Sequence, residues 1–354
     1  MSLTTWNGDR VETGVVHLDI AGCGRISRSA LAAEVGHLQA EAEVGGYVAM
    51  GEAARVVDGG RVALAAMVGL AGGDLCFLDG AGTAFATLLE AWPLHRGARV
   101  GFTPSEYGAN ARRLRRLAAE RGWELVSLPV DADGRVLHVP AGLDLVTFPQ
   151  VASQRGVLQP VEEVLATGTP LLLDVAQSLG QVPVPAGCAA YVGTSRKWLC
   201  GPRGVGFAVV APEVQASLTE PATLAPAHGG GMLRWEVQEA HIAGQVGLAV
   251  AAQQWSPSVG QASVTIAAYA RQVLEGIAGW RVREDVEEPT AITTLSGGDP
   301  FATRIALQKA GFVTSVVPAS RSDDLDEPVL RVSTGAWVEP AHLDALAREL
   351  TRTG

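Results

Sequence analysis

Lysine is almost absent from this chain, and one of its two lysines stands in a setting suited to chemistry. Lysine and arginine together number 27 among 354 residues, but only Lys197 and Lys309 are lysines. Lys197 lies in the glycine-rich run TSRKWLCGPRGVG at 194–206. Lysine, unlike arginine, becomes a nucleophilic amine when its pKa is lowered, so we interpret Lys197 as a reactive amine rather than a solvated turn residue. Lys309 precedes a glycine at a predicted helix end and is interpreted as a surface cation.

An aspartate ends an apolar run upstream of this lysine. Asp174 follows Leu171–Leu173, and Gln177 comes three residues later. A carboxylate at that place can pair with the protonated ring nitrogen of an aromatic cofactor and keep the ring able to accept electrons. Taken alone, a strand-end aspartate is better explained as a helix N-cap. The isolated Lys197 downstream favours the cofactor interpretation.

A run of small residues at 79–85 lies between an apolar stretch and a helical pattern. Unhindered backbone N–H groups and a hydroxyl at a helix N-terminus form an anion site that suits a phosphate. The residues that would supply it are Ala81, Gly82 and Thr83. Plain helix capping explains the run equally well. Phe85 stands where the dinucleotide fingerprint Gly-x-Gly-x-x-Gly has its third glycine, so that fingerprint is absent.

Two neighbours of the lysine extend the phosphate hypothesis. Thr194 and Arg196 could donate further hydrogen bonds to a phosphate. Arg196 also places a fixed positive charge beside Lys197, which would lower the lysine pKa and favour its neutral, reactive form.

Composition excludes several classes of function. The formal charge of −10 argues against a nucleic-acid partner, and the basic cluster within 112–116 is interpreted as the solvated face of a helix. The best apolar run, 62–70, is too short to span a bilayer, and the N-terminus has no signal pattern, so we expect a cytoplasmic protein without a membrane partner. The four cysteines and seven histidines show no ligand spacing, so no metal site is predicted.

Apolar runs alternate with helical periodicity between residues 75 and 210, which predicts an α/β fold with a mainly parallel sheet. The predicted strands are 75–78, 98–102, 125–128, 143–148, 171–173, 189–192 and 205–210. The predicted helices between them are 83–92, 109–121 and 161–166. Asp79, Asp174 and the Lys197 segment would then meet at the carboxyl ends of the strands, where such sheets bind ligands.

Proline and glycine punctuate residues 211–235, and helical patterns follow at 237–254 and 261–277. The rest of the chain alternates strands and helices and closes on an amphipathic helix at 341–350. We therefore predict a large domain at 13–235 and a small domain at 236–354 that includes residues 1–12.

The spaced motifs around the lysine resemble those of the class V (fold type I) pyridoxal-phosphate enzymes, across most of the chain. The shared features are Asp-x-x-Gln, Thr/Ser-x-x-Lys and a Gly-Pro-x-Gly-x-Gly turn. Further matching segments are HLDIAG at 17–22, the small-residue run at 79–85, SEYGAN at 105–110 and LRVS at 330–333. The resemblance implies pyridoxal 5'-phosphate on Lys197 and a homodimer.

The resemblance also implies roles for single residues. Tyr107 replaces the histidine that stacks on the cofactor ring, and Ser153 stands where many relatives have asparagine. Arg331 matches the arginine that grips the substrate carboxylate, for which bidentate pairing is the physical reason. Without the other motifs, a solvated strand arginine would explain Arg331 as well.

Differences from the family's motifs limit the reactions that we expect of this chain. The stretch 316–329, where a desulfurase carries its catalytic cysteine, contains none, so a persulfide mechanism is not expected. Gln238 and Glu239 replace a Gly-Thr pair whose threonine reaches the partner subunit's phosphate in the family, so the resemblance does not extend to that contact.

One branch of the family matches further segments, namely GGY at 45–47, ASQRG at 152–156, TSRKW at 194–198 and EPTAIT at 288–293. This branch comprises the hercynylcysteine sulfoxide lyases of ergothioneine biosynthesis. The resemblance implies β-elimination from an amino-acid sulfoxide, giving pyruvate, ammonia and a sulfenic acid. A trimethylammonium group could contact Tyr47 or Trp235, but core packing is the better explanation of either ring. A class V aminotransferase, or a non-catalytic scaffold of the same fold, remains the alternative.

Overall fold

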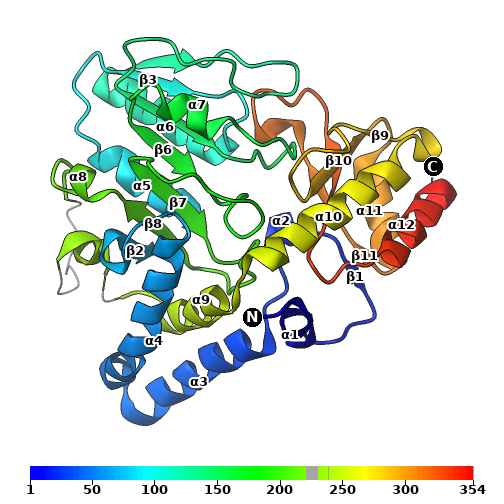
Figure 1. Cartoon of the computed structure of the whole chain (residues 1–354), viewed down its shortest axis with the longest axis horizontal. Coiled ribbons are helices and arrows are strands. Elements are labelled where there is room, and N and C mark those ends of the chain that lie inside the picture. The colour runs from blue at the N-terminus through cyan, green and yellow to red at the C-terminus, as the bar shows by residue number, and fades with distance from the viewer. Residues whose placement is uncertain (221–229, 238, 354) are drawn as a thin grey trace.

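A seven-stranded sheet forms the centre of the larger part of the molecule (Figure 1). The computed structural model describes residues 1–220, 230–237 and 239–353. In sheet order the strands are β2 (Leu75–Leu78), β8 (Gly206–Val210), β7 (Ala190–Thr194), β6 (Leu171–Asp174), β5 (Leu145–Pro149), β3 (Arg99–Phe102) and β4 (Glu124–Ser127). Strands β7 to β4 pair in parallel, whereas β8 is antiparallel to both β2 and β7. The predicted α/β fold with a mainly parallel sheet is confirmed.

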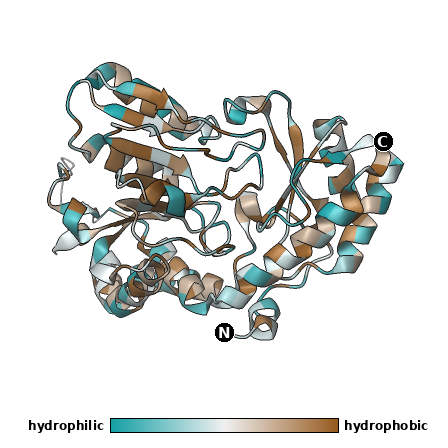
Figure 2. Cartoon of the chain, turned by 45° about the horizontal axis from the view of Figure 1, so that its top comes forward, coloured by the Kyte–Doolittle hydropathy of each residue, from teal (hydrophilic) through white to brown (hydrophobic). Residues whose placement is uncertain are grey.

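The central strands of the sheet are mainly apolar because both faces of the sheet are covered there, whereas the edge strand β4 is partly exposed. Successive side chains of β6 illustrate this, since Leu171 and Leu173 enter one core while Leu172 enters the other. Helices α4 (Gly46–Ala66), α7 (Val161–Leu165) and α9 (Ile242–Gln254) contribute to the first core, and α5 (Ala81–Ala91) and α6 (Gly108–Arg121) to the second. Figure 2 shows the resulting concentration of hydrophobic residues in the strands.

A smaller antiparallel sheet carries the C-terminal part of the chain. Its order is β12 (Ser315–Val317), β13 (Val329–Ser333), β10 (Ile292–Ser296) and β9 (Arg281–Val282). The helices that pack around it are α10 (Pro257–Leu274), α11 (Pro300–Lys309) and α12 (Pro340–Thr353). Strand β1 (Val16–His17) comes from the other end of the chain and pairs in parallel with β11 (Phe312–Val313). This separate two-stranded sheet ties the N-terminal segment to the small part of the molecule.

The contacts of the helices bear on the division into domains. Helices α3 (Arg28–Val44) and α4 both pack on α9, so α9 lies with the large sheet although it follows residue 236. Helix α9 begins at Ile242, five residues later than the helix predicted at 237–254. Residue 238 of that predicted helix and residues 221–229 of the predicted connection lie outside the described residues. By contacts, the two parts divide between α9 and α10. The independent domains proposed at 13–235 and 236–354 stay a prediction.

Short elements complete the chain. They are α1 (Leu3–Gly8), α2 (Ile20–Cys23), α8 (Pro212–Gln215) and the helical turns Gly72–Asp74, Gly231–Trp235, Ile277–Gly279 and Ala319–Arg321.

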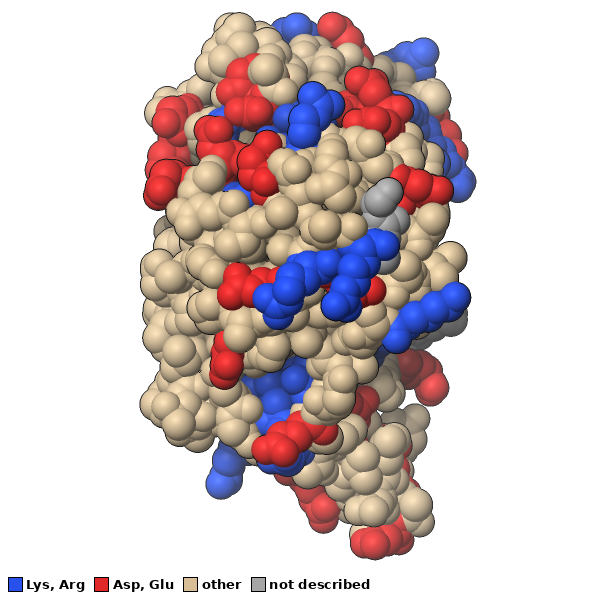
Figure 3. Space-filling view, turned by 90° about the vertical axis from the view of Figure 1, so that its right-hand side faces the viewer, with Lys and Arg blue, Asp and Glu red and all other residues tan. Residues whose placement is uncertain are grey.

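Charged groups of both signs are interspersed on the face formed by the small part (Figure 3). The basic cluster of α6 is also matched by acids, since Arg113 pairs with Glu90 at 2.9 Å and Arg116 with Glu120 at 2.7 Å. Its arginines are exposed or half-buried, as the interpretation of a solvated face predicts. Within the described residues, no helix has the length and apolarity needed to cross a bilayer.

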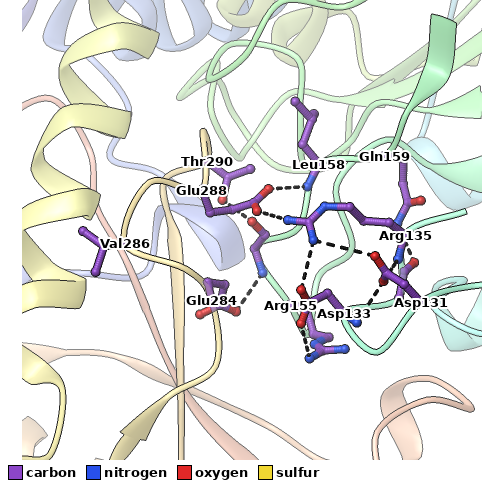
Figure 4. A network of polar contacts seen from close by, with 12 residues as sticks. Asp131, Asp133, Arg135, Arg155, Leu158, Gln159, Glu284, Val286, Glu288 and Thr290 are labelled. Carbon is purple, nitrogen blue, oxygen red and sulfur yellow. Dashed lines mark hydrogen bonds and ion pairs between the residues drawn. The ribbon is translucent and has the colours of Figure 1, made fainter. Parts of the chain in front are cut away.

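A polar network joins the two parts of the molecule (Figure 4). Glu288, from the small part, pairs with Arg135 of the large part and accepts a hydrogen bond from the backbone N–H of Leu158 at 2.8 Å. Glu284 accepts from the N–H of Gly156 at 2.9 Å. These bonds fix the segment 151–158 against the small sheet. That segment lines one wall of the cavity described next.

Candidate active site

A cavity of about 690 Å³ opens at the carboxyl ends of the parallel strands, between the two parts of the molecule. Loops after β2, β3, β5, β6 and β7 line it on one side, and β12 and β13 on the other. All the predicted site residues lie in its wall except the two aromatic residues suggested for a trimethylammonium group. These residues are Ala81, Gly82, Thr83, Tyr107, Ser153, Asp174, Gln177, Thr194, Arg196, Lys197 and Arg331.

Lys197 follows β7 and reaches the cavity as a half-buried side chain. The pKa of Lys197 is lowered to about 7: burial is the largest cause, the charge of Asp174 opposes it, and the charges of Arg196, Arg331 and Arg321 add to the lowering. The amine is therefore about half neutral near pH 7. The effect predicted for Arg196 has the right direction, but desolvation is the larger cause.

Asp174 ends β6 and belongs to a chain of buried polar groups. Its carboxylate accepts hydrogen bonds from the backbone N–H of Ala176 at 2.8 Å and from Asn110 Nδ2 at 3.0 Å. Asn110 Nδ2 also donates to Glu106 Oε1 at 3.2 Å. Burial first, and then the charge of Asp174, raises the pKa of Glu106 to about 8, and burial also raises the pKa of Asp174. Glu106 is therefore mostly protonated at neutral pH, whereas Asp174 has Lys197 nearby to favour its charged form.

Gln177 is held by two bonds that fix the orientation of its amide. Its Nε2 donates to the carbonyl of Ala21, and its Oε1 accepts from Trp198 Nε1, both at 3.0 Å. The second bond ties the loop after β6 to the residue next to Lys197. Gln177 thus helps to position the lysine segment.

The start of α5 provides an anion site in the same cavity. No side chain caps this helix, so the N–H groups at Ala81, Gly82 and Thr83 are left to the cavity they line. A Cβ on Gly82 would meet nothing within 4 Å, which shows open space at this point. Thr194 and Arg196 line the same cavity, so the residues present fit a bound phosphate. The simple capping alternative lacks a capping side chain.

Arg331, on β13, is positioned by three partners. Its guanidinium donates to the carbonyl of Ser153 at 2.9 Å, to Ser315 Oγ at 3.1 Å and to Asp19 Oδ1 at 3.0 Å. The pairing with Asp19 and the burial of the side chain rule out the solvated-strand interpretation. The backbone carbonyl of Ser153 therefore helps to fix the arginine, and a contact of Ser153 with the cofactor stays a prediction.

Three residues that contribute to the site were not predicted as site residues from the sequence. Asn110 stood in a segment recognised as a motif, and its spacing of four residues from Glu106 could have suggested the shared hydrogen bond. Asp19 likewise lay in a matched segment. Arg321 lies with its guanidinium carbon 5.4 Å from the ring centroid of Tyr107, in a loop considered only for its missing cysteine.

The two aromatic residues suggested for a trimethylammonium group are not in the cavity. Tyr47 is 70 % exposed near the start of α4, so in a single chain it neither lines this cavity nor packs in a core. Its contact with the substrate stays a prediction. Trp235 is buried in the core beneath β2 and β8, which confirms core packing for this residue.

Comparisons with known proteins agree with this geometry. The family model "Aminotransferase class-V" matches residues 16–255. A probable hercynylcysteine sulfoxide lyase of Mycobacterium tuberculosis is 38 % identical over an alignment covering 98 % of this chain and 92 % of the relative. A solved complex of the cystine C–S lyase C-DES with cysteine persulfide has a TM-score of 0.85 at 17 % identity, covering 96 % of this chain and 98 % of that one. The cysteine desulfurase CsdA of Escherichia coli also reaches a TM-score of 0.85, at 15 % identity and with coverage of 100 % and 98 %.

Proposed function

Because the chain belongs to the aminotransferase class-V family, we propose that it cleaves the Cβ–S bond of hercynylcysteine S-oxide by β-elimination. The products would be pyruvate, ammonia and the sulfenic acid of ergothioneine, which a reductant converts to ergothioneine. The cofactor is pyridoxal phosphate. One observation carries the proposal, namely that Lys197, Asp174 and Arg331 face one cavity whose described lining contains no cysteine. A desulfurase needs a thiol there to take up sulfur, whereas a sulfoxide lyase does not.

The residues of the cavity have separable tasks in this reaction. The cofactor, when bound, supplies an aromatic ring that accepts charge from Cα. Asp174 would pair with the ring nitrogen and hold a proton there. Arg331 would hold the α-carboxylate, and Lys197 Nζ, neutral in about half of the molecules at pH 7, would bind the cofactor and take the proton from Cα.

Tyr107 is suited to protonate the departing group. Its ring lies at the cavity wall just before α6, and its phenol is a donor that can protonate a sulfenate as the Cβ–S bond breaks. The electron pair of that bond leaves with sulfur, so the proton that Tyr107 gives completes a neutral sulfenic acid. Solvent would return a proton to Tyr107.

The proposal is tested by incubating the pyridoxal-phosphate-loaded protein with hercynylcysteine S-oxide and a thiol reductant. We expect pyruvate and ergothioneine to form in equal amounts. Cysteine is the matched comparison substrate, because a desulfurase converts it to alanine. Alanine from cysteine, or transfer of the amino group to an added keto acid without pyruvate, would overturn the lyase proposal in favour of a desulfurase or an aminotransferase.

The cysteines fit a cytoplasmic protein, which we propose as its location. All four are free, and Cys76, Cys188 and Cys200 are buried. Free, buried thiols are typical of a reducing compartment.

An apolar face on α3 and α4 supports the proposed homodimer. Large hydrophobic side chains at least 40 % exposed lie along both helices, namely Leu31, Val35, Leu38, Val44, Tyr47, Val48, Val56 and Val62. The first three recur at intervals of four and three residues and so share one side of α3. An exposed face of this kind is typical of an interface between protein chains. A second copy of the chain would bury it and would also cover Tyr47.

Substitution of Leu38 by glutamate should therefore convert a dimer to a monomer. Leu38 is 47 % exposed, so the change removes apolar contact from the interface without disturbing the core. Light scattering after size-exclusion chromatography measures the outcome at micromolar protein. Leu137→Glu is the control, because Leu137 is 63 % exposed and belongs to neither α3 nor α4. A wild-type protein that is already monomeric would contradict the proposed face.

A further inference from the structure

Arg321 brings a guanidinium to the cavity from the small part of the molecule. It ends the helical turn Ala319–Arg321, between β12 and β13, and lines the cavity together with Arg331. The turn packs closely on the start of α6, since a Cβ built on Gly108 would lie 2.7 Å from the carbonyl oxygen of Arg321. The position of Arg321 beside Tyr107 is therefore fixed by backbone packing as well as by the stacking contact.

The other cationic groups of the cavity already have tasks or partners. The guanidinium of Arg331 is held by Asp19, Ser315 and Ser153, and that of Arg196 donates to the carbonyl of Gly22. Among the described residues, no hydrogen bond or ion pair is formed by the guanidinium of Arg321. Its charge acts on the other cations of the cavity, because it contributes to the lowered pKa of both Lys197 and Arg331.

The acids nearest to Arg321 in sequence point to other partners. Asp323 forms an ion pair with Arg115 on α6. Asp324 accepts hydrogen bonds from Ser105, from Ser322 and from Gln154 Nε2. The carboxylates of this loop are thus paired with other residues, and the guanidinium of Arg321 is left at the cavity wall.

We propose that Arg321 binds a second carboxylate of the substrate, carried by the group attached to sulfur. This inference rests on the proposed lyase function. The phosphate of the cofactor belongs to the start of α5 and the α-carboxylate to Arg331, so a third anionic group is needed to match Arg321. The preferred substrates are then S-substituted cysteine S-oxides with a carboxylate on the departing group, a class to which the betaine of hercynylcysteine S-oxide belongs. Tyr107, beneath the guanidinium, would lie next to the same departing group.

A matched pair of substrates tests the inference. S-(2-carboxyethyl)cysteine S-oxide carries the second carboxylate, and S-propylcysteine S-oxide lacks it at similar size. A charge-assisted hydrogen bond contributes about 1.5–3 kcal/mol, which corresponds to roughly 10- to 150-fold in binding. In Arg321→Gln we expect KM for the carboxylated substrate to rise by about that factor, while KM for the uncharged substrate stays within about twofold. Loss of the Arg321 charge also raises the pKa of Lys197, and the resulting change in kcat should be the same for both substrates. Arg321→Lys should recover part of the loss.

Calorimetry with the two corresponding thioethers separates this inference from the lyase proposal. These compounds have no sulfoxide oxygen, so no sulfenate can be released from them. Tighter binding of the carboxylated thioether, abolished in Arg321→Gln, supports the carboxylate site even if no substrate yields pyruvate. Equal binding of both thioethers by the wild type, or an equal loss for both in the variant, overturns it. Thermal melting of Arg321→Gln and Arg321→Lys establishes that both variants fold.

Discussion

Lys197→Ala is expected to lose covalent attachment of pyridoxal phosphate and at least about 10³-fold in kcat. Lys197 would hold the cofactor and also move the Cα proton, and removal of a positioned base alone typically costs about 10²–10⁴-fold. Borohydride reduction followed by peptide mass analysis measures the attachment. Reduction should label the peptide containing residue 197 in the wild type and no peptide in the variant.

The second lysine of the chain provides the control for this experiment. Lys309 is exposed on the last turn of α11, away from the cavity lining. Lys309→Ala should keep the full label and wild-type kcat. Lys197→Arg should behave like the alanine variant, because arginine keeps a charge but cannot form the covalent link. A label that persists in Lys197→Ala would refute the assignment.

The large sheet could be predicted from the sequence because helices cover both of its faces, and this double burial makes the sequences of its central strands apolar. A strand buried on two faces, such as Leu171–Leu173 in β6, must be apolar at every position. Helices α3 and α4 were missed for the opposite reason. Their apolar residues are divided between the core and an exposed face, and glycines at 45, 46, 51, 59 and 60 obscure the helical pattern.

The candidate site was predictable as far as it depends on strand ends and on motifs. Asp174 and Lys197 end or closely follow parallel strands, so the topology alone brings them to the same edge of the sheet. Arg321 enters the cavity only because the small part folds back over that edge. Among the described residues its guanidinium has no partner, partly because Asp323 is paired with Arg115, 208 positions away in sequence. Local patterns do not encode such a contact.

Asp174→Asn is expected to lower kcat by about 10³-fold while leaving the cofactor attached to Lys197. The amide has the shape of the carboxylate but no charge with which to hold a proton on the ring nitrogen, so the ring accepts less charge from Cα. Loss of a preorganised electrostatic group of this kind typically costs roughly 10²–10³-fold, or 2.7–4 kcal/mol. Pyruvate release measures kcat, and the visible absorption spectrum of the cofactor reports the protonation of the ring.

Glu106→Gln is the matched control, since Asn110 bridges Glu106 and Asp174 and both carboxyl groups are buried. The pKa of Glu106 is raised to about 8, so at pH 7 its side chain is mostly neutral and glutamine replaces it closely. We expect nearly wild-type kcat for this variant at pH 7. The variant and the wild type should diverge only above pH 8, where Glu106 ionises and glutamine does not. An equal loss of kcat in Glu106→Gln and Asp174→Asn at pH 7 would contradict this prediction. It would mean that the hydrogen bonds among Glu106, Asn110 and Asp174 matter, and not the charge of Asp174.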